Sequence, residues 1–137
     1  MNESDTILLV ENDQVDIMTV RRVMRDLKIR NRLETALNGE EALDRLNNKS
    51  LHPPAMILLD LNMPRMSGLE FLEIAKKDDD LKSIPVVVLT TSKEKRDRRQ
   101  SFDHSIAGYI VKPVDYNEFL DTFKIIYDYW NINELPE

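Results

Sequence analysis

The sequence contains no cysteine, only three glycines and one tryptophan, and no long hydrophobic run. The lack of cysteine excludes disulfides, thiolate metal sites and cysteine nucleophiles. With so few glycines there is no Gly-rich loop to cradle a nucleotide's phosphates, which argues against a nucleotide-binding fold. No apolar stretch approaches the length of a membrane span, and residues 1–13 lack the basic start of a signal peptide. We therefore expect a cytoplasmic protein without a membrane partner.

The composition of the chain is that of a globular protein. Its 137 residues are 42% hydrophobic and 32% charged, which suits one domain with a true hydrophobic core. The formal net charge of −6 argues against nucleic acid as a partner.

Short apolar runs recur along the chain and predict strands. Four of them are rich in Val, Ile and Leu and too short for buried helices, so we interpret them as central strands of a parallel sheet. These are TILLV (6–10), MILLD (56–60), IPVVVLT (84–90) and GYIVK (108–112). A weaker run, RLETAL (32–37), alternates in polarity and is interpreted as an edge strand.

The segments between these runs show helical spacing. One apolar face carries Ile17, Val20, Met24 and Leu27, and another carries Phe119, Phe123, Ile126 and Trp130. Four helix starts resemble capping boxes, in which a short polar side chain accepts from the first backbone N–H groups. The pairs are Asn38 with Glu41, Ser67 with Glu70, Thr91 with Glu94, and Asp115 with Glu118. The alternation predicts an α/β fold, a five-stranded parallel sheet doubly wound by five helices into a three-layer sandwich.

Polar residues follow four of the expected strands. In open α/β sheets ligands bind beyond the carboxyl ends of the strands, so these residues are candidates for a site. They are Glu11, Asn12 and Asp13 after the first strand, Asp60 and Asn62 after the third, Thr90 and Thr91 at the fourth, and Lys112 at the fifth. Each one alone has an ordinary interpretation as a cap, a turn residue or a surface charge. Their joint placement favours a functional site.

The combination resembles the receiver domain of two-component response regulators, across nearly the whole chain. The segments that carry the resemblance are LLVEND, LLDLNMPRMSG, VVVLTTS and GYIVKP, in that order. Within the family the chain is most similar to stand-alone receivers that accompany phytochrome-type histidine kinases. The Pro53-Pro54 loop, VVVLTTSK and the tail YDYWNINELP suggest this narrower likeness.

The resemblance implies a flavodoxin-like (βα)5 fold and a role for each candidate residue. Asp60 would be the nucleophile that accepts a phosphoryl group from a kinase phosphohistidine. Lys112 and Thr90 would contact phosphoryl oxygens, and Thr90 with Tyr109 would form the switch. Mg²⁺ would be held at a set of oxygens from the loops after the first and third strands. The family pattern assigns this set to Glu11, Asn12, Asp60 and the backbone carbonyl of Asn62. It also implies a cis peptide between Lys112 and Pro113.

Two features depart from the family pattern. Asn12 stands where a second acid is usual and offers only a neutral oxygen, so we expect weaker Mg²⁺ binding. Residues 92–105 predict a helix that is polar almost all round, with Phe102 as its one sizeable apolar residue. We expect this helix to be among the least stable elements. Its basic residues are most simply a solvated face, although they could recruit an acidic partner surface.

The resemblance implies a signalling switch rather than a conventional enzyme. We expect residues 1–137 to form a single receiver domain with no output domain, so output would come from protein–protein contact. The expected partners are a sensor histidine kinase or a phosphotransfer protein, and a second copy through the fourth and fifth helices. Tyr127, Tyr129 and Trp130 are candidates for such contacts, although some of them must be core.

Two alternatives remain. A degenerate receiver would keep the fold as a binding module that phosphate does not switch, and Asn12 is its only support. An aspartate-nucleophile phosphatase of another α/β family would require an acid two residues after Asp60. Asn62 is there instead.

Overall fold

A computed structural model describes residues 1–134 and shows one parallel sheet of five strands. The strands are β1 (Thr6–Val10), β2 (Arg32–Ala36), β3 (Met56–Leu59), β4 (Val86–Thr90) and β5 (Gly108–Val111). They lie in the order β2-β1-β3-β4-β5. All neighbours are parallel. The predicted α/β fold and its five strands are confirmed.

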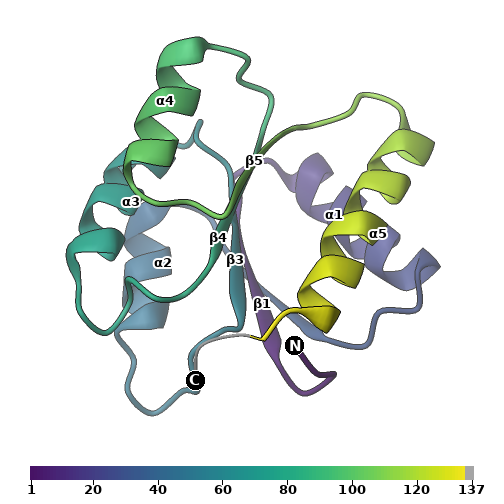
Figure 1. Cartoon of the computed structure of the whole chain (residues 1–137), viewed down its shortest axis with the longest axis horizontal. Helices are drawn as coiled ribbons and strands as arrows, with labels where there is room; N and C mark the ends of the chain where they lie inside the picture. The colour runs from purple at the N-terminus through teal and green to yellow at the C-terminus, as the bar shows by residue number, and fades with distance from the viewer. Residues whose placement is uncertain (135–137) are drawn as a thin grey trace.

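Five helices cover the two faces of the sheet, as predicted (Figure 1). They are α1 (Gln14–Asp26), α2 (Gly39–Leu46), α3 (Gly68–Lys77), α4 (Lys95–Asp103) and α5 (Tyr116–Ile132). Helices α2, α3 and α4 lie on one side and α1 and α5 on the other. None of the helices within residues 1–134 is long and apolar enough to cross a membrane.

Side chains alternate between two cores because successive strand residues point to opposite faces. Leu8, Ile57 and Val86 join the core beneath α2 and α3. Ile7, Leu58 and Val87 join the core beneath α1 and α5. The predicted apolar faces of α1 and α5 lie in this second core, including Trp130, which is 6% exposed. The sheet is thus buried on both faces, which gives the site a rigid base.

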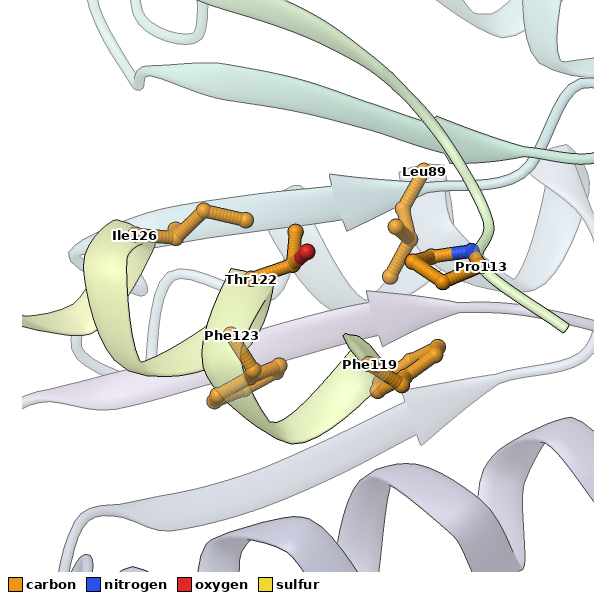
Figure 2. A pocket seen from close by; sticks show the side chains of 6 residues that line it. All are labelled: Leu89, Pro113, Phe119, Thr122, Phe123 and Ile126. Atoms are coloured by element: carbon orange, nitrogen blue, oxygen red, sulfur yellow. The ribbon is translucent and has the colours of Figure 1, made fainter. Parts of the chain in front are cut away.

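Figure 2 shows how α5 packs on the sheet near the carboxyl end of β4. Phe119, Thr122, Phe123 and Ile126 of α5 lie against Leu89 and Pro113 and line a small, mostly apolar pocket with them. Of the aromatic residues near the end of α5, Trp130 lies in the core, whereas Tyr129 is 55% exposed.

Three of the four predicted helix caps are present. The side chains of Asn38, Ser67 and Asp115 accept from the backbone N–H of Glu41, Glu70 and Glu118 respectively. At Ser67 the capping box is complete, since the Glu70 carboxylate also accepts from the Ser67 N–H. These caps place the first turns of α2, α3 and α5 where the sequence predicts them.

The predicted cap at Thr91 is wrong. Helix α4 begins at Lys95 after Glu94, whose side chain makes no capping bond. Ser92 takes the role instead, because its Oγ accepts from the Glu94 N–H at 3.3 Å and donates to Asp97 Oδ2 at 2.6 Å. Phe102 is 51% exposed and so is not the expected apolar anchor, whereas Ser101 is fully buried. The helix therefore has even less apolar attachment than its sequence indicates.

The segment 108–112 is an edge strand, not the central strand that its apolar run predicts. Strand β5 pairs only with β4, and all four of its residues are half-buried. An apolar run indicates that helices cover both faces of a strand. It does not indicate whether the strand has a second hydrogen-bonded neighbour in the sheet. The expected edge position of β2 is confirmed.

Candidate functional site

The site lies at one edge of the sheet because all strands are parallel. Register pairs Val10 with Leu59, and Thr90 with Val111, so the strand ends are level. The next residue after three of these strands still donates its N–H to a neighbouring strand. Glu11 donates to the Ala36 carbonyl at 2.9 Å, Asp60 to Val10 at 3.0 Å, and Lys112 to Thr90 at 2.8 Å. The sheet thereby fixes the backbone of all three charged residues.

Asp60 is buried at the end of β3. The residue is 7% exposed, and its Oδ1 is buried without a hydrogen-bond partner. It is the one such side-chain atom among residues 1–134. Buried polar atoms are normally paired, so an unpaired oxygen on a charged group indicates a place for a ligand.

Gly68 allows the loop after Asp60 to close tightly. A Cβ at this position would lie 2.5 Å from the Asp60 carbonyl oxygen and 2.7 Å from Leu61 Cα. Both are backbone atoms that cannot move aside easily. The Gly68 N–H donates to the Leu61 carbonyl at 3.0 Å, which brings the start of α3 against the site.

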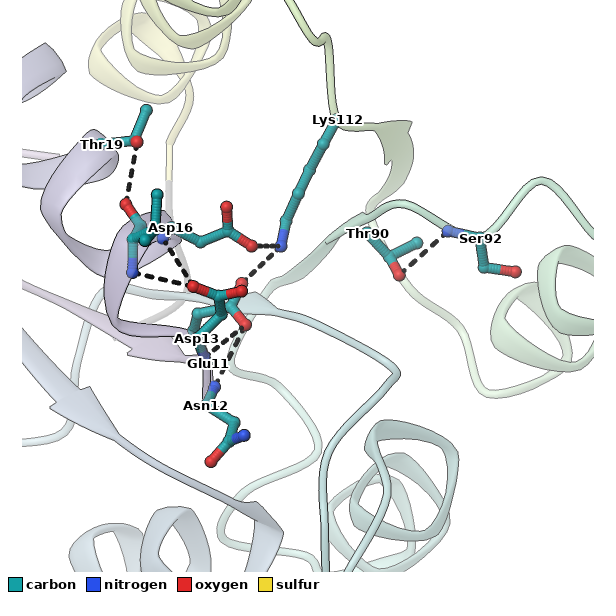
Figure 3. A network of polar contacts seen from close by, with 9 residues as sticks. Glu11, Asn12, Asp13, Asp16, Thr19, Thr90, Ser92 and Lys112 are labelled. Atoms are coloured by element: carbon teal, nitrogen blue, oxygen red, sulfur yellow. Dashed lines mark hydrogen bonds and ion pairs between the residues drawn. The ribbon is translucent and has the colours of Figure 1, made fainter.

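Glu11 is the second buried carboxylate and is 2% exposed. Its Oε2 accepts from the backbone N–H of Asn12 at 3.1 Å and of Asp13 at 3.3 Å, and its Oε1 accepts from Lys112 (Figure 3). Burial, together with the negative charge of Asp60, raises the pKa of Glu11 to about 7 against the opposing effect of Lys112. The two carboxylates thus share a region that is short of positive charge.

Lys112 is the only cation with a side chain buried in this cluster, at 8% exposure. Besides Glu11 it donates to Asp16 Oδ2 at 2.8 Å, and it makes no hydrogen bond to Asp60. Burial lowers the pKa of Lys112, but the bonds to Asp16 and Glu11 and the charge of Asp60 outweigh it, so the pKa is raised overall. Lys112 is therefore charged and already paired.

The Lys112–Pro113 peptide bond is trans, because no peptide bond within residues 1–134 is cis. The expected cis peptide is therefore a correction to the sequence prediction. The trans form is intrinsically favoured before proline, and from it the Lys112 side chain still reaches the carboxylates of the site.

Asp16 belongs to the cluster, although the sequence analysis did not single it out as a site residue. Asp13 alone caps α1, since its Oδ1 accepts from the N–H groups of Val15 at 2.8 Å and Asp16 at 3.3 Å. The Asp16 side chain is free to point to Lys112 (Figure 3). The available signal was an acid in the first turn of the helix that follows the loop of residues 11–13.

Thr90 and Tyr109 meet at Ser92. Thr90 is fully buried, and its Oγ1 accepts from the Ser92 N–H at 3.3 Å. The Tyr109 hydroxyl donates to the Ser92 carbonyl at 3.0 Å. The same peptide segment therefore contacts the strand-end hydroxyl, the aromatic of β5 and, through the Ser92 side chain, the start of α4.

The remaining predicted metal ligands, Asn12 and Asn62, are exposed. In Figure 3 the Asn12 side chain points away from the Glu11 and Asp13 carboxylates. Residues 1–134 hold no cluster of three or more acids, histidines or cysteines that is close enough for a metal ion. The two buried acids of the site are Glu11 and Asp60, and the unpaired oxygen belongs to Asp60. Both carboxylates offer oxygen ligands whose negative charge a cation would neutralise. This donor set fits a hard divalent cation.

The chain is similar to known response regulators over nearly its full length. The family of response regulator receiver domains matches residues 7–124. The probable methanogenesis regulatory protein FilR2 of Methanothrix harundinacea is 36% identical over 129 residues, which are 90% of this chain and 82% of that protein. Response regulator Rcp1 of Synechocystis sp. is 33% identical over 133 residues, which are 94% of this chain and 90% of that protein.

Solved structures agree with this likeness. The phosphorylated cyanobacterial phytochrome response regulator RcpA has a TM-score of 0.91 at 32% identity, with 98% of this chain and 99% of that chain covered. The Mn²⁺-bound form of Rcp1 has a TM-score of 0.89 at 33% identity, with 97% and 99% covered. The chain therefore belongs to the response regulator receiver domains, the phosphoacceptors of two-component signalling.

Proposed function

We propose that Asp60 is the phosphoacceptor of this receiver. The observation that carries the proposal is its buried Oδ1, which has no hydrogen-bond partner although a buried lysine lies in the same cluster. A carboxylate that served only the fold would pair its buried oxygens. An unpaired oxygen at a rigid strand end is available as a nucleophile.

The transfer requires an attack by one Asp60 carboxylate oxygen on the phosphorus of a phosphohistidine. An O–P bond forms, the P–N bond breaks, and its electron pair returns to the imidazole, which leaves an acyl phosphate. Positioning and charge neutralisation dominate such transfers. Lys112 supplies a fixed positive charge, and the Thr90 hydroxyl can donate to a phosphoryl oxygen. Later hydrolysis of the acyl phosphate regenerates Asp60, so the chain acts as a switch rather than a conventional enzyme.

Glu11, Asp60 and the backbone carbonyl of Asn62 would hold Mg²⁺, with the Asn12 amide as a weaker donor. When bound, the ion neutralises phosphoryl charge at the acceptor. The raised pKa of Glu11 supports this assignment, because two buried carboxylates with a single cation favour the entry of another. The neutral amide of Asn12 supports our expectation that binding is weaker than with an acid at that position.

Mass spectrometry tests the acceptor directly. The protein is incubated with acetyl phosphate and Mg²⁺, and we expect a gain of one phosphoryl group that hydroxylamine removes and that maps to Asp60. Asp60→Asn abolishes the gain. Asp80→Asn is the matched control, since Asp80 is an exposed aspartate whose side chain pairs with Lys49. Label on another residue in Asp60→Asn at the wild-type rate would refute the assignment.

We further propose that Thr90 and Tyr109 transmit phosphorylation to α4. A phosphoryl group that attracts the Thr90 hydroxyl changes the environment of the Ser92 N–H, and Tyr109 holds the carbonyl of that same residue. Since Ser92 also contacts Asp97, a shift at Ser92 reaches the first turn of α4. This helix has little apolar attachment and is well suited to respond.

The partners we propose are a histidine kinase or phosphotransfer protein and a second copy of this chain. Receiver domains of this family exchange phosphoryl groups with such proteins. The second copy would bind at α4 and α5, which flank the edge strand β5 (Figure 1). Ile125, Tyr129 and Ile132 form an exposed apolar stripe on α5 at helical spacing, and their exposed fractions are 71%, 55% and 82%.

Light scattering with and without beryllofluoride tests self-association. We expect a dimer that Ile125→Ser weakens. Met18→Ser is the matched control, because Met18 is a comparably exposed apolar residue on α1, at 67%. Equal masses for wild type and Ile125→Ser under every condition would refute this interface.

A further inference from the structure

The buried lysine of the site has two carboxylate partners, and neither is the acceptor. Lys112 donates to Glu11 and to Asp16 (Figure 3), whereas Asp60 Oδ1 has no partner. A lysine ammonium has three N–H donors, so two are committed before any phosphoryl group arrives. The amino group is held by the first turn of α1 on one side and by the end of β1 on the other.

We infer that Asp16 is a positioning residue that restrains Lys112 in the unphosphorylated protein and competes with the phosphoryl group for it. This inference rests on the proposed function of Asp60. On this reading, one carboxylate of α1, that of Asp16, influences how readily Asp60 is phosphorylated.

Helix capping does not explain the position of the Asp16 side chain. Asp13 already accepts from the N–H groups of Val15 and Asp16. The hydrogen bond of the Asp16 carboxylate goes across the fold to Lys112, 96 residues away in sequence. Asp16 thus contributes its charge to the site rather than to the start of the helix.

Burial decides which of the two contacts of Lys112 can be released. The Glu11 side chain is 3% exposed, so a Glu11 carboxylate without the lysine would remain buried and charged. The Asp16 side chain is 36% exposed, and water can solvate it once the lysine leaves. The Asp16 contact is therefore the one that yields when a phosphoryl group binds.

The Asp16 charge opposes phosphorylation in two ways. It occupies one N–H donor of Lys112, and it repels a phosphoryl group that carries nearly two negative charges. Both effects have the same sign, so loss of the Asp16 carboxylate favours the phosphorylated state. A contact with a purely structural role would have the opposite effect, because its loss would leave Lys112 less well placed.

Equilibrium binding of beryllofluoride, a phosphoryl analogue, separates these two cases. The titration uses the full chain at saturating Mg²⁺, with the amide resonances of Thr90 and Ser92 as the NMR readout. We expect Asp16→Asn to bind about threefold to fivefold more tightly than wild type, the range that a partly exposed ion pair supports. Asp16→Ser also lacks the carboxylate and has the same expected gain. Labelling by acetyl phosphate is faster in both variants.

Asp44→Asn is the matched control, because it removes the same charge from an exposed position on α2, on the opposite side of the sheet. Its affinity stays at the wild-type value. The inference is overturned if Asp16→Asn and Asp16→Ser bind no more tightly than Asp44→Asn. Weaker binding would show that Asp16 presents Lys112 to the acceptor instead of restraining it, and would overturn it equally. Failure of the proposed function would give a different result. If Asp60 is not the acceptor, Asp60→Asn binds beryllofluoride as tightly as wild type.

Discussion

Asp60→Asn is expected to stabilise the metal-free protein while it abolishes phosphorylation. The carboxylate holds a buried oxygen without a partner, and its charge helps to raise the pKa of Glu11. An unsatisfied buried polar group costs about 1–3 kcal/mol, and more when it is charged. The asparagine is nearly isosteric and neutral, so it removes the repulsion but not the whole desolvation cost. We expect a gain of about 1–2 kcal/mol in the free energy of unfolding at pH 8.

The pH dependence follows from Glu11. A shift of its pKa from 4.5 to about 7 corresponds to roughly 3 kcal/mol of lost stability once the group is ionised. The folded state binds this proton more tightly than the unfolded state, so wild-type stability falls as the pH rises from 4.5 through 7. Burial is the main cause of the shift and remains in the variant. Asp60→Asn removes only the part due to Asp60, so its advantage is larger at pH 8 than at pH 5.

Urea denaturation with EDTA at constant ionic strength measures both effects. The fluorescence of Trp130 reports unfolding, since this residue is buried beneath α5. Asp44→Asn controls for the change in net charge. The reasoning is refuted if Asp60→Asn is less stable than wild type at pH 8, or if its advantage is the same at both pH values.

Three further predictions concern the metal, the switch loop and the fold. Asn12→Asp should tighten Mg²⁺ binding about tenfold by calorimetry, since a carboxylate that turns from its exposed position toward the ion adds a full negative charge. The same charge, close to those of Glu11 and Asp60, should lower metal-free stability. Unchanged affinity would show that position 12 does not face the ion. Thr90→Ala should accept phosphate on Asp60 yet show a reduced shift of the Ser92 amide, and a full shift would remove Thr90 from the switch. Gly68→Ala should lose about 2 kcal/mol or more in urea melts, because its Cβ would lie 2.5 Å from a backbone oxygen, and wild-type stability would contradict this.

The exchange of backbone amides tests the expected weakness of α4. Its one fully buried residue is Ser101, and Phe102 is half exposed. We expect the amides of 95–103 to exchange faster than those of β4, where every residue is buried. Equal protection in the two segments would contradict the prediction.

Local signals in the sequence were sufficient for most of the elements and for the charged residues that meet at the carboxyl end of the sheet. Apolar runs located the strands, and short polar residues three positions before an acid located the starts of α2, α3 and α5. Strand direction then placed Asp60, Glu11 and Lys112 at one edge, because parallel strands end together. These inferences succeed because each depends on residues close together in the chain.

Tertiary structure alone decided which charged side chains pair, and it also decided where some of the predictions from local sequence patterns fail. Asp16 and Lys112 are 96 residues apart, and only the folded chain, which brings the Lys112 side chain to the first turn of α1, makes them an ion pair. The edge position of β5 depends on which strands pair, and the start of α4 depends on Ser92 rather than Thr91. The burial that raises the pKa of Glu11 comes from the assembled sheet. The sequence determined which chemical groups reach the site, and long-range packing decided which of them are neutralised and which, like Asp60, are left unpaired.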